Sequence, residues 1–364
     1  MKDNIIILGL DIGGANTKAA LILFDDKNIE NTFSYIEYFP FWEKSITNLD
    51  NLFKNIIERF IIKSGFNLDD LSYIAITITA ELSDAFQTKR EGILTVLNAL
   101  KKVFPIKKQY FISHSGKFIT FDEVKNNPLN IAAANWVSTA LYLGKFVPNC
   151  ILIDSGSTTT DIIPIVDSKP VTKGDNDITR MINHELIYTG GLRATIPSIT
   201  HFVPYRGNMV RISFEKFALV SDVHMIMGNI TEKDYINDTA DNRPKKLEYC
   251  YARLARIICM DIESISKEEL NQIAEYIYNM QLNIIKTEIT LFYNELINRY
   301  PLFKENPHFI VTGLSADFLI KKALNALGFS NISDYKQITN IPDNINSSAL
   351  AVAGAFYYYP PNSI

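Results

Sequence analysis

Two glycine-bent turns that each begin with an aspartate are the residues of this chain best suited to chemistry. The first is Asp11-Ile12-Gly13-Gly14 and the second is Asp154-Ser155-Gly156-Ser157, 143 positions later (154 minus 11). An apolar run enters each turn and an alternating run leaves it, which predicts a β-hairpin in both copies. Glycine lets backbone amides approach a phosphate closely. The pair therefore predicts a phosphate clamp between two domains, whereas one copy alone would be an ordinary hairpin.

The carboxylates of Asp11 and Asp154 are the candidate metal ligands. Two carboxylates that face one gap can hold a hydrated Mg²⁺, which in turn bridges phosphate oxygens. Alternatively, either aspartate could simply cap its own turn. Lys18 could likewise be a surface residue rather than a ligand of phosphate. The candidate phosphate-binding residues of the two turns are Gly13, Gly14, Asn16, Thr17, Lys18, Gly156, Ser157, Thr158 and Thr159.

Two further glycine-containing segments extend this set. HFIVTGLSADFLIKKAL runs from an apolar strand through Gly313 into a helix that Ser315 or Asp317 can cap. In YTGGLRATIP an exposed glycine backbone and a guanidinium can meet a phosphate, which makes candidates of Gly190, Gly191 and Arg193. The alternative for the second segment is a simple turn with a solvated arginine.

Two further groups of charged residues could belong to the site or could have a structural role. Asp222 and His224 in SDVHMIMG share one face if the segment is a strand, where they could bind a metal or a substrate, although a buried, hydrogen-bonded histidine is the alternative. Asp241 and Arg243 precede a helix with further charges, and this group lies over the cleft or forms a surface charge network. The further charges are Arg253, Arg256 and Asp261.

Apolar spacing predicts the elements that position these residues. Helices are expected over SITNLDNLFKNIIERFIIKSG, with Ser45 or Thr47 as its cap and Gly65 as its stop, and over SDAFQTKREGILTVLNALKKVF, LNIAAANWVSTALYLG, YCYARLARIICMD, EELNQIAEYIYNMQLNIIKTEITLFYNELINRY and SSALAVAGAFYY. The last returns to domain one. The chain has 364 residues, 47% of them hydrophobic, so we expect two α/β domains. Residues 1–130 together with 335–364 form the first, and residues 131–334 form the second.

Composition narrows the classes of partner. Thirty-six basic and forty acidic residues give a formal charge of -4, which predicts no affinity for nucleic acid. The sequence shows no membrane-spanning run and no signal pattern, so small-molecule partners and a cytoplasmic location are expected. The spacing of Cys150, Cys250 and Cys259 supports neither disulfides nor a thiolate metal site, and three reduced thiols are expected.

The three glycine corners resemble those of the superfamily of acetate and sugar kinases, heat-shock chaperones and actin. Residues 10–18 and 153–161 match its two phosphate motifs, and residues 310–317 match its adenosine motif imperfectly, since Leu314 follows Gly313. The resemblance implies a two-domain actin-like (ribonuclease H-like) ATPase fold with an interdomain cleft. The sugar kinases keep a carboxylate on a loop of domain one, which implies Glu81 or Asp84 as general base, with His224 as the other candidate. The alternative is that Ser83 and Asp84 cap a helix.

The chain resembles one branch of the superfamily most closely. The segments that carry this resemblance are DIGGANTK, TAELSDAF, DSGSTTTDIIP, YTGGLRATIP, SDVHMIMG, TADNRP and RLARIICMD. This branch holds the archaeal hydantoinase/oxoprolinase-like proteins. It implies a transferase of methanofuran biosynthesis, in which the phenol of γ-glutamyltyramine displaces diphosphate from 5-(aminomethyl)-3-furanmethanol diphosphate, with Mg²⁺ and without ATP. The alternatives are an ATP-dependent small-molecule kinase or an oxoprolinase/hydantoinase-like hydrolase, and a non-catalytic actin-like nucleotide switch. Too few cysteines are present for the iron-sulfur dehydratase activators.

Overall fold

The computed structural model describes residues 5–14, 16–25, 28–41, 48–341 and 347–361. Its contacts divide the chain into two units, Met1–Asn149 with Ile163–Thr179 and Tyr335–Ile364, and Cys150–Ile162 with Arg180–Asp334. Residues 131–149 and 163–179, which the sequence analysis placed in the second domain, lie in the first unit. There α4 (Asn135–Gly144) packs on α12 (Ser347–Tyr358), and the ring of Tyr142 lies against Gly354, where a side chain would not fit.

The first unit is built on a six-stranded sheet in the order β3-β2-β1-β4-β5-β6. Its central strand pairs antiparallel with β2 across the predicted hairpin and parallel with β4. The strands are β1 (Ile5–Gly13), β2 (Asn16–Asp25), β3 (Asn28–Tyr38), β4 (Tyr73–Thr79), β5 (Gln109–Ile112) and β6 (Phe118–Thr120).

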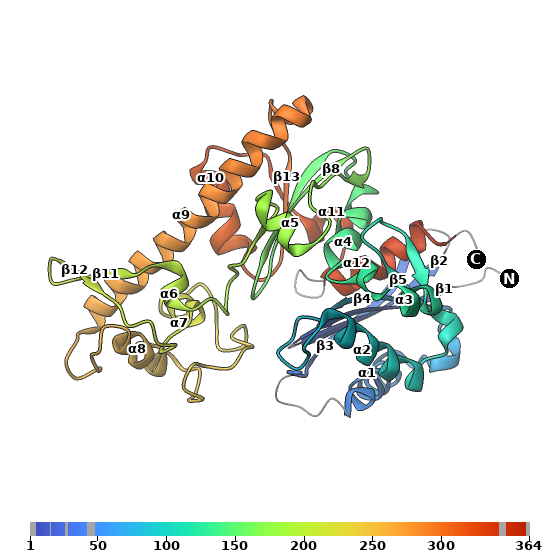
Figure 1. Cartoon of the computed structure of the whole chain (residues 1–364), viewed down its shortest axis with the longest axis horizontal. Coiled ribbons are helices and arrows are strands. Elements are labelled where there is room, and N and C mark those ends of the chain that lie inside the picture. The colour runs from blue at the N-terminus through green and yellow to red at the C-terminus, as the bar shows by residue number, and fades with distance from the viewer. Residues whose placement is uncertain (1–4, 15, 26–27, 42–47, 342–346, 362–364) are drawn as a thin grey trace. The chain divides into compact units, whose positions relative to one another are not determined.

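Helices cover both faces of this sheet (Figure 1). They are α1 (Leu49–Ser64), α2 (Lys89–Val103), α3 (Phe121–Asn126), α4, α11 (Tyr335–Thr339) and α12. Alternate residues of β1, among them Leu10 and Ile12, join the core under α1 and α2. The intervening positions Gly9 and Asp11 face α12, which packs on the backbone of Gly9 so closely that no side chain fits. The alternation therefore carries Asp11 beneath the start of α12.

Two predicted helix ends can be compared with the structure. Gly65 ends α1 in the left-handed conformation, as predicted, while Ser45 and Thr47 lie outside the described residues. The predicted capping of α2 by Ser83 or Asp84 is wrong. Thr88 is its N-cap and accepts a hydrogen bond from the backbone N–H of Glu91.

A second sheet repeats the strand arrangement of the first. It has the order β10-β8-β7-β13-β14, with β9 on β8, so a central strand again has a hairpin partner on one side and a parallel strand on the other. Residues 163–170 of this sheet fall within the range of the first unit. The strands are β7 (Cys150–Ser155), β8 (Thr160–Val166), β9 (Lys169–Pro170), β10 (Leu186–Ile187), β13 (Phe309–Thr312) and β14 (Ile332–Asp334). Both predicted hairpins and the duplicated α/β architecture are confirmed.

A helical insertion packs around the long helix α9 (Lys267–Arg299), and the ribbon of β11 and β12 lies beside that helix (Figure 1). Helix α5 (Asp177–Ile182) spans the boundary between the two ranges. The remaining elements of the second unit are α6 (Ile196–Ile199), β11 (Phe202–Tyr205), β12 (Asn208–Arg211), α7 (Val220–Ile226), α8 (Leu247–Arg256), the π-helical turn η6 (Ala316–Ile320) and α10 (Lys321–Ala326). The strand considered for SDVHMIMG is wrong. Asp222 Oδ2 accepts a hydrogen bond from the backbone N–H of Leu219 and so starts helix α7.

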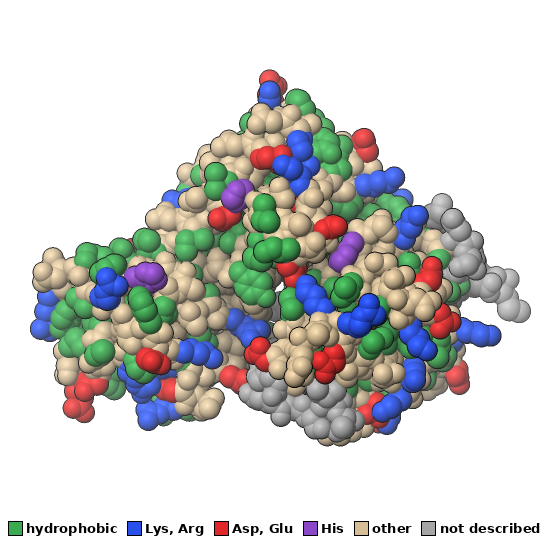
Figure 2. Space-filling view, in the orientation of Figure 1, with side chains coloured by type: hydrophobic (Ala, Val, Ile, Leu, Met, Phe, Trp, Pro, Cys, Tyr) green, Lys and Arg blue, Asp and Glu red, His purple; other side chains and the backbone are tan. Residues whose placement is uncertain are grey.

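The described surface carries mixed charge. Figure 2 shows Lys, Arg, Asp and Glu side chains interspersed on the face that it presents, without a large field of one sign. Of the helices in the described part of the chain, none has the length and apolar character to cross a membrane. None of the three cysteines forms a disulfide, and Cys259 is exposed while Cys150 and Cys250 are buried.

Candidate functional site

The first turn places a carboxylate with one fixed and one open oxygen. Asp11 is 6% exposed, and its Oδ2 accepts a hydrogen bond of 2.5 Å from Ser348 Oγ. Lys18, its cross-strand partner, brings Nζ to 3.9 Å from the same oxygen and to 3.4 Å from Ser348 Oγ. The other oxygen, Oδ1, is buried and has no hydrogen-bond partner among the described residues. Asp11 therefore presents one unsatisfied anionic oxygen at the end of β1.

The glycines of this turn lie beside the loop that follows β4. A side chain added at Gly14 would meet Ser83 at an ordinary 3.5 Å and is otherwise unobstructed. Ser83 Oγ is buried and has no hydrogen-bond partner within the described residues. Asn16 begins β2. Thr17 pairs in register with Ile12, so its side chain lies on the sheet face opposite to Asp11. The structure thus brings Gly14 and Ser83 together and places Thr17 on the other sheet face from Asp11.

Glu81 is the buried carboxylate of this region. It is 1% exposed, and α2 packs on its backbone at Gly92, where a side chain would come within 2.8 Å of the Glu81 Cα. Burial raises the pKa of Glu81 to about 7, against the lowering effects of a backbone hydrogen bond and of the nearby Lys89, while Asp177 adds to the rise. Asp84 is exposed, three positions along. The raised pKa poises the carboxylate of Glu81 to exchange a proton near neutral pH.

The first turn fits a divalent cation. A buried carboxylate oxygen without a partner is unfavourable unless a ligand satisfies it, and oxygen is the donor that Mg²⁺ prefers. The described residues contain no cluster of three or more His, Cys, Asp or Glu side chains that could hold a metal. Mg²⁺ is commonly held by one or two carboxylates together with substrate phosphates. Asp11 supplies such a carboxylate in the first unit, and Asp154 is the next-to-last residue of the corresponding strand, β7, in the second.

The second turn is tied to the segment that follows Thr189. The backbone N–H of Gly191 donates to the carbonyl oxygen of Gly156 at 2.9 Å, and the N–H groups of Leu192 and Arg193 both donate to that of Ser157 at 3.0 Å. These amides are therefore engaged within the protein, and the Arg193 side chain is exposed. These three N–H groups of the YTGGLR segment therefore shape the second turn and are not free to bind a phosphate.

Buried hydroxyl groups join the third corner to the second. Ser315 Oγ lies 2.7 Å from Ser155 Oγ, which lies 2.7 Å from Thr160 Oγ1, and that hydroxyl donates to the carbonyl of Thr189 at 2.9 Å. The predicted capping roles of Ser315 and Asp317 are wrong, because Ser315 makes no side-chain cap and Asp317 pairs with Lys321 at 2.7 Å. The three segments recognised in sequence converge in one unit.

The free space around each glycine distinguishes glycines that pack against protein from glycines that a ligand can approach. A side chain at Gly190 or Gly313 would collide with the backbone of the second turn, and at Gly191 it would lie 3.1 Å from Ser315 Cβ. Gly313 also has a φ of +93°, which favours glycine. A side chain at Gly156, by contrast, would meet a first atom only at 4.0 Å. The first three glycines are thus required by protein packing, whereas Gly156, like Gly14, lies at a turn that a ligand can approach.

His224 lies inside the second unit, away from solvent. Its ring is fully buried, with Nε2 3.0 Å from Gln281 Oε1 and Nδ1 3.1 Å from Asn229 Nδ2, and burial lowers its pKa to about 3. A buried ring with both nitrogens engaged is poorly suited to take a proton from a substrate. We therefore favour Glu81 as the base.

The remaining charged candidates form a network under α7 and α8. Arg253 donates from Nε to Asp222 Oδ1 at 2.8 Å and from a terminal nitrogen to Asp241 at 3.1 Å. Arg256 reaches the other oxygen of Asp241 at 2.8 Å. Arg243 is exposed at 3.9 Å from Asp241, and Asp261 caps a turn after α8. Of the two alternatives, the structure shows a charge network, and its centre is buried.

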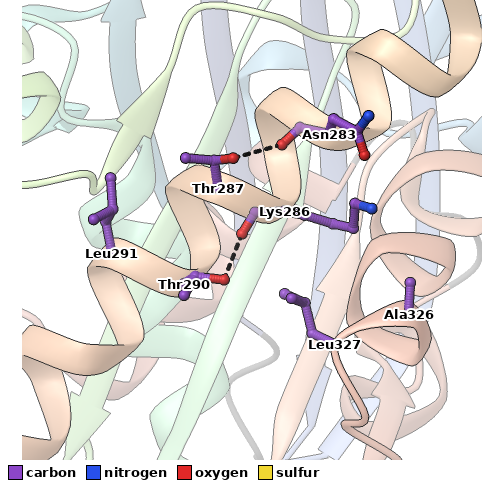
Figure 3. A pocket seen from close by; sticks show the side chains of 7 residues that line it. All are labelled: Asn283, Lys286, Thr287, Thr290, Leu291, Ala326 and Leu327. Atoms are coloured by element: carbon purple, nitrogen blue, oxygen red, sulfur yellow. Dashed lines mark hydrogen bonds between the residues drawn. The ribbon is translucent and has the colours of Figure 1, made fainter.

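A surface hollow of about 350 Å³ lies elsewhere, between α9 and the end of α10 (Figure 3). Thr287 and Thr290 line it but donate to carbonyl oxygens of their own helix. The hollow contains none of the predicted site residues, and its hydroxyl donors are already used. We do not place the chemistry there.

Sequence reasoning gave no part in the site to four polar residues that lie at or support the first and second turns. Ser348, Ser83, Ser315 and Gln281 are single polar residues in segments that were assigned only a helix or a turn. The one signal was composition, because a serine at the start of an otherwise apolar helix such as SSALAVAGAFYY must find a polar partner when buried.

Known proteins resemble this chain in sequence along most of its length. The family model Hydantoinase/oxoprolinase matches residues 72–356. The (4-{4-[2-(γ-L-glutamylamino)ethyl]phenoxymethyl}furan-2-yl)methanamine synthase of Methanocaldococcus jannaschii is 37% identical over 333 residues, 91% of this chain and 92% of that protein. A protein of the same name from Methanococcus vannielii is 34% identical over 183 residues, 50% of this chain and 78% of its own.

Solved structures support the fold. The nucleotide-free structure of acetone carboxylase has a TM-score of 0.53 and 11% sequence identity, and the match covers 96% of this chain and 70% of that one. At this identity the likeness concerns the fold alone. Together with the repeated strand order, it confirms the predicted actin-like α/β fold.

Proposed function

The chain belongs to the hydantoinase/oxoprolinase family, and we propose that it is a transferase of methanofuran biosynthesis. It joins the phenol oxygen of γ-glutamyltyramine to 5-(aminomethyl)-3-furanmethanol diphosphate and releases diphosphate. The match with the Methanocaldococcus jannaschii synthase over most of both chains carries the proposal. The name of that relative contains a phenoxymethyl group on a furan, so the product that it names contains an aryl ether.

The first half of the chemistry is removal of a proton. Attack forms a bond between the phenol oxygen and the furanylic carbon while the bond from that carbon to the diphosphate oxygen breaks. The phenol, with an ordinary pKa near 10, loses its proton to Glu81, whose own pKa is about 7. A positioned base of this kind is typically worth about 100- to 10,000-fold. Glu81 is the loop carboxylate whose environment suits that role.

The second half is stabilisation of the leaving diphosphate. Negative charge grows on the diphosphate as the bond breaks. The backbone amides of Gly14 in the first turn, and of Ser157 and Thr158 in the second, are suited to receive it, while the N–H of Gly156 itself donates to the carbonyl of Thr159 at 3.0 Å. Asp11 and Asp154 would hold Mg²⁺, which neutralises charge on the phosphate oxygens. Lys18, beside Asp11, adds a cation on the same sheet face. The joint action of the two half-sites on one substrate is part of the proposal.

Mass spectrometry tests this function directly. Purified protein with Mg²⁺ and both substrates is expected to form the ether and release diphosphate at the same rate with and without ATP. Asp11→Asn and Asp154→Asn are each expected to reduce turnover by at least about 100-fold. Asp317→Asn, at an exposed carboxylate, is the matched control. A phosphorylated product, or turnover that requires ATP, would instead identify a kinase or an ATP-dependent hydrolase.

A further inference from the structure

A chain of buried polar side chains runs from α7 through α9 to the second turn. Gln281, in the middle of α9, is 1% exposed although the apolar residues around it form the core of the helical insertion. Its Nε2 donates to the carbonyl oxygen of Gly190 and to Thr189 Oγ1, each at 2.9 Å. Its Oε1 lies 3.0 Å from Nε2 of His224. All its partners lie within the same unit.

The chemistry of these groups fixes the direction of every hydrogen bond. The carbonyl of Gly190 can only accept, so the amide nitrogen of Gln281 faces it and the amide oxygen faces His224. His224 must therefore donate from Nε2. Asn229 Nδ2 can only donate, so it satisfies Nδ1 as an acceptor. Both constraints require the neutral imidazole with its proton on Nε2.

The segment held by Gln281 is the one that shapes the second turn. Gly190 packs so closely on that turn that a side chain would lie 2.6 Å from the carbonyl oxygen of Gly156. The next residues donate three backbone hydrogen bonds to Gly156 and Ser157. A displacement of Gly190 would therefore displace the turn itself. No other side chain in the described structure is shown to donate to the Gly190 carbonyl.

We propose that Gln281 and His224 are positioning residues for the diphosphate site. Gln281 holds the Gly190 backbone against the second turn, and His224 holds the amide of Gln281 in the orientation that this requires. This inference rests on the proposed function, because it assumes that the second turn binds diphosphate. It assigns His224 a role that involves no contact with substrate and no proton transfer.

Binding of inorganic diphosphate in the presence of Mg²⁺, measured by calorimetry, tests the inference without turnover. Gln281→Met keeps the length of the side chain but removes its donor, and His224→Leu removes the donor to Gln281. Each is expected to weaken diphosphate binding about tenfold, the scale of one hydrogen bond. His224→Gln can still donate to Gln281 and accept from Asn229, so it is expected to bind within about twofold of the wild type. Gln272→Met, at an exposed position of the same helix, is the control.

The outcomes separate this inference from the proposed function. If the wild-type protein does not bind diphosphate, the proposed function is wrong. If the wild type binds it and Gln281→Met or His224→Leu binds equally well, the positioning role is wrong. ¹⁵N NMR of the histidines adds a test that needs no folded variant of Gln281. The His224 signal, assigned by its loss in His224→Gln, should report a neutral ring with the proton on Nε2 from pH 5 to 8, and titration in that range would overturn the inference.

Discussion

Ser348 donates a 2.5 Å hydrogen bond from Oγ to Oδ2 of Asp11. The two residues are 337 positions apart in the sequence. The contact is possible because α12 packs directly on the backbone of Gly9, two residues before Asp11 on the same sheet face. Ser348 thereby occupies one carboxylate oxygen and leaves the buried Oδ1 open. The C-terminal helix thus completes the first half of the proposed cation site.

Ser348→Ala is expected to weaken Mg²⁺ binding by roughly 10- to 100-fold, since loss of a hydrogen bond to a charged group costs about 1.5–3 kcal/mol and frees Asp11 to rotate. Mn²⁺ binding in the presence of diphosphate, followed by electron paramagnetic resonance, measures the effect without turnover. Ser330→Ala, at an exposed serine, is the control. Unchanged Mn²⁺ affinity in Ser348→Ala would show that Asp11 needs no such support.

The pH dependence of turnover should report Glu81. A general base acts in its deprotonated form, so kcat/KM is expected to be low in acid, to rise with an apparent pKa of about 7 and to level off above it. Glu81→Gln should abolish this acid limb and reduce kcat/KM by about 100-fold or more. Asp84→Asn, at the exposed carboxylate of the same loop, should leave the limb in place. If the fall of kcat/KM in acid persists in Glu81→Gln, another group must be the one whose protonation it reports.

The buried carboxylate of Glu81 should also lower the free energy of unfolding at high pH. Burial raises the folded-state pKa of Glu81 from 4.5 to about 7, so its favourable contribution is complete below pH 4.5 and is lost as the pH rises through 7. Glu81→Gln is therefore expected to stabilise the protein at pH 8, by up to about 3 kcal/mol, and to change little at pH 4. Urea unfolding at the two pH values measures this difference. Equal effects at both would indicate that Glu81 does not titrate in the folded state.

Two charged neighbours should move the acid limb in opposite directions. Lys89 and Asp177, which pair at 3.4 Å, respectively lower and raise the pKa of Glu81. Lys89→Met is expected to shift the acid limb of kcat/KM to higher pH, and Asp177→Asn to lower pH. A shift in the same direction for both variants would contradict the assignment of the limb to Glu81.

Three glycines should respond differently to a methyl group. Gly313 and Gly207 both have positive φ, but a side chain at Gly313 would strike the backbone of Ser155 whereas Gly207 is open. Gly207→Ala is expected to cost about 1 kcal/mol of folding free energy and Gly313→Ala several times more. Gly156→Ala should fold normally, because its position is open, yet bind diphosphate less well. Thermal unfolding and calorimetry distinguish these results, and similar stability of Gly313→Ala and Gly207→Ala would refute the packing role.

The sequence predicted the local elements better than the contacts between them. The two hairpins and the stop at Gly65 follow from local patterns of apolar residues and glycine. Helix α7 was missed because a short apolar segment fits a strand equally well, and the capping bond of Asp222 decides the outcome. The packing role of Gly190 and Gly313 could not be inferred, since a glycine next to a ligand and one next to protein backbone look alike in sequence. Pairs such as Ser155 with Ser315 depend on tertiary packing alone.

The origin of the ether oxygen tests the proposed reaction most directly. With γ-glutamyltyramine labelled with ¹⁸O in its phenol, Mg²⁺ and no ATP, the ether product should retain the label and the released diphosphate should contain none. Retention follows because the phenol oxygen attacks the carbon and the diphosphate leaves with its own oxygen. Label in a phosphate product, or no ether until ATP is added, would contradict diphosphate displacement and indicate phosphoryl transfer.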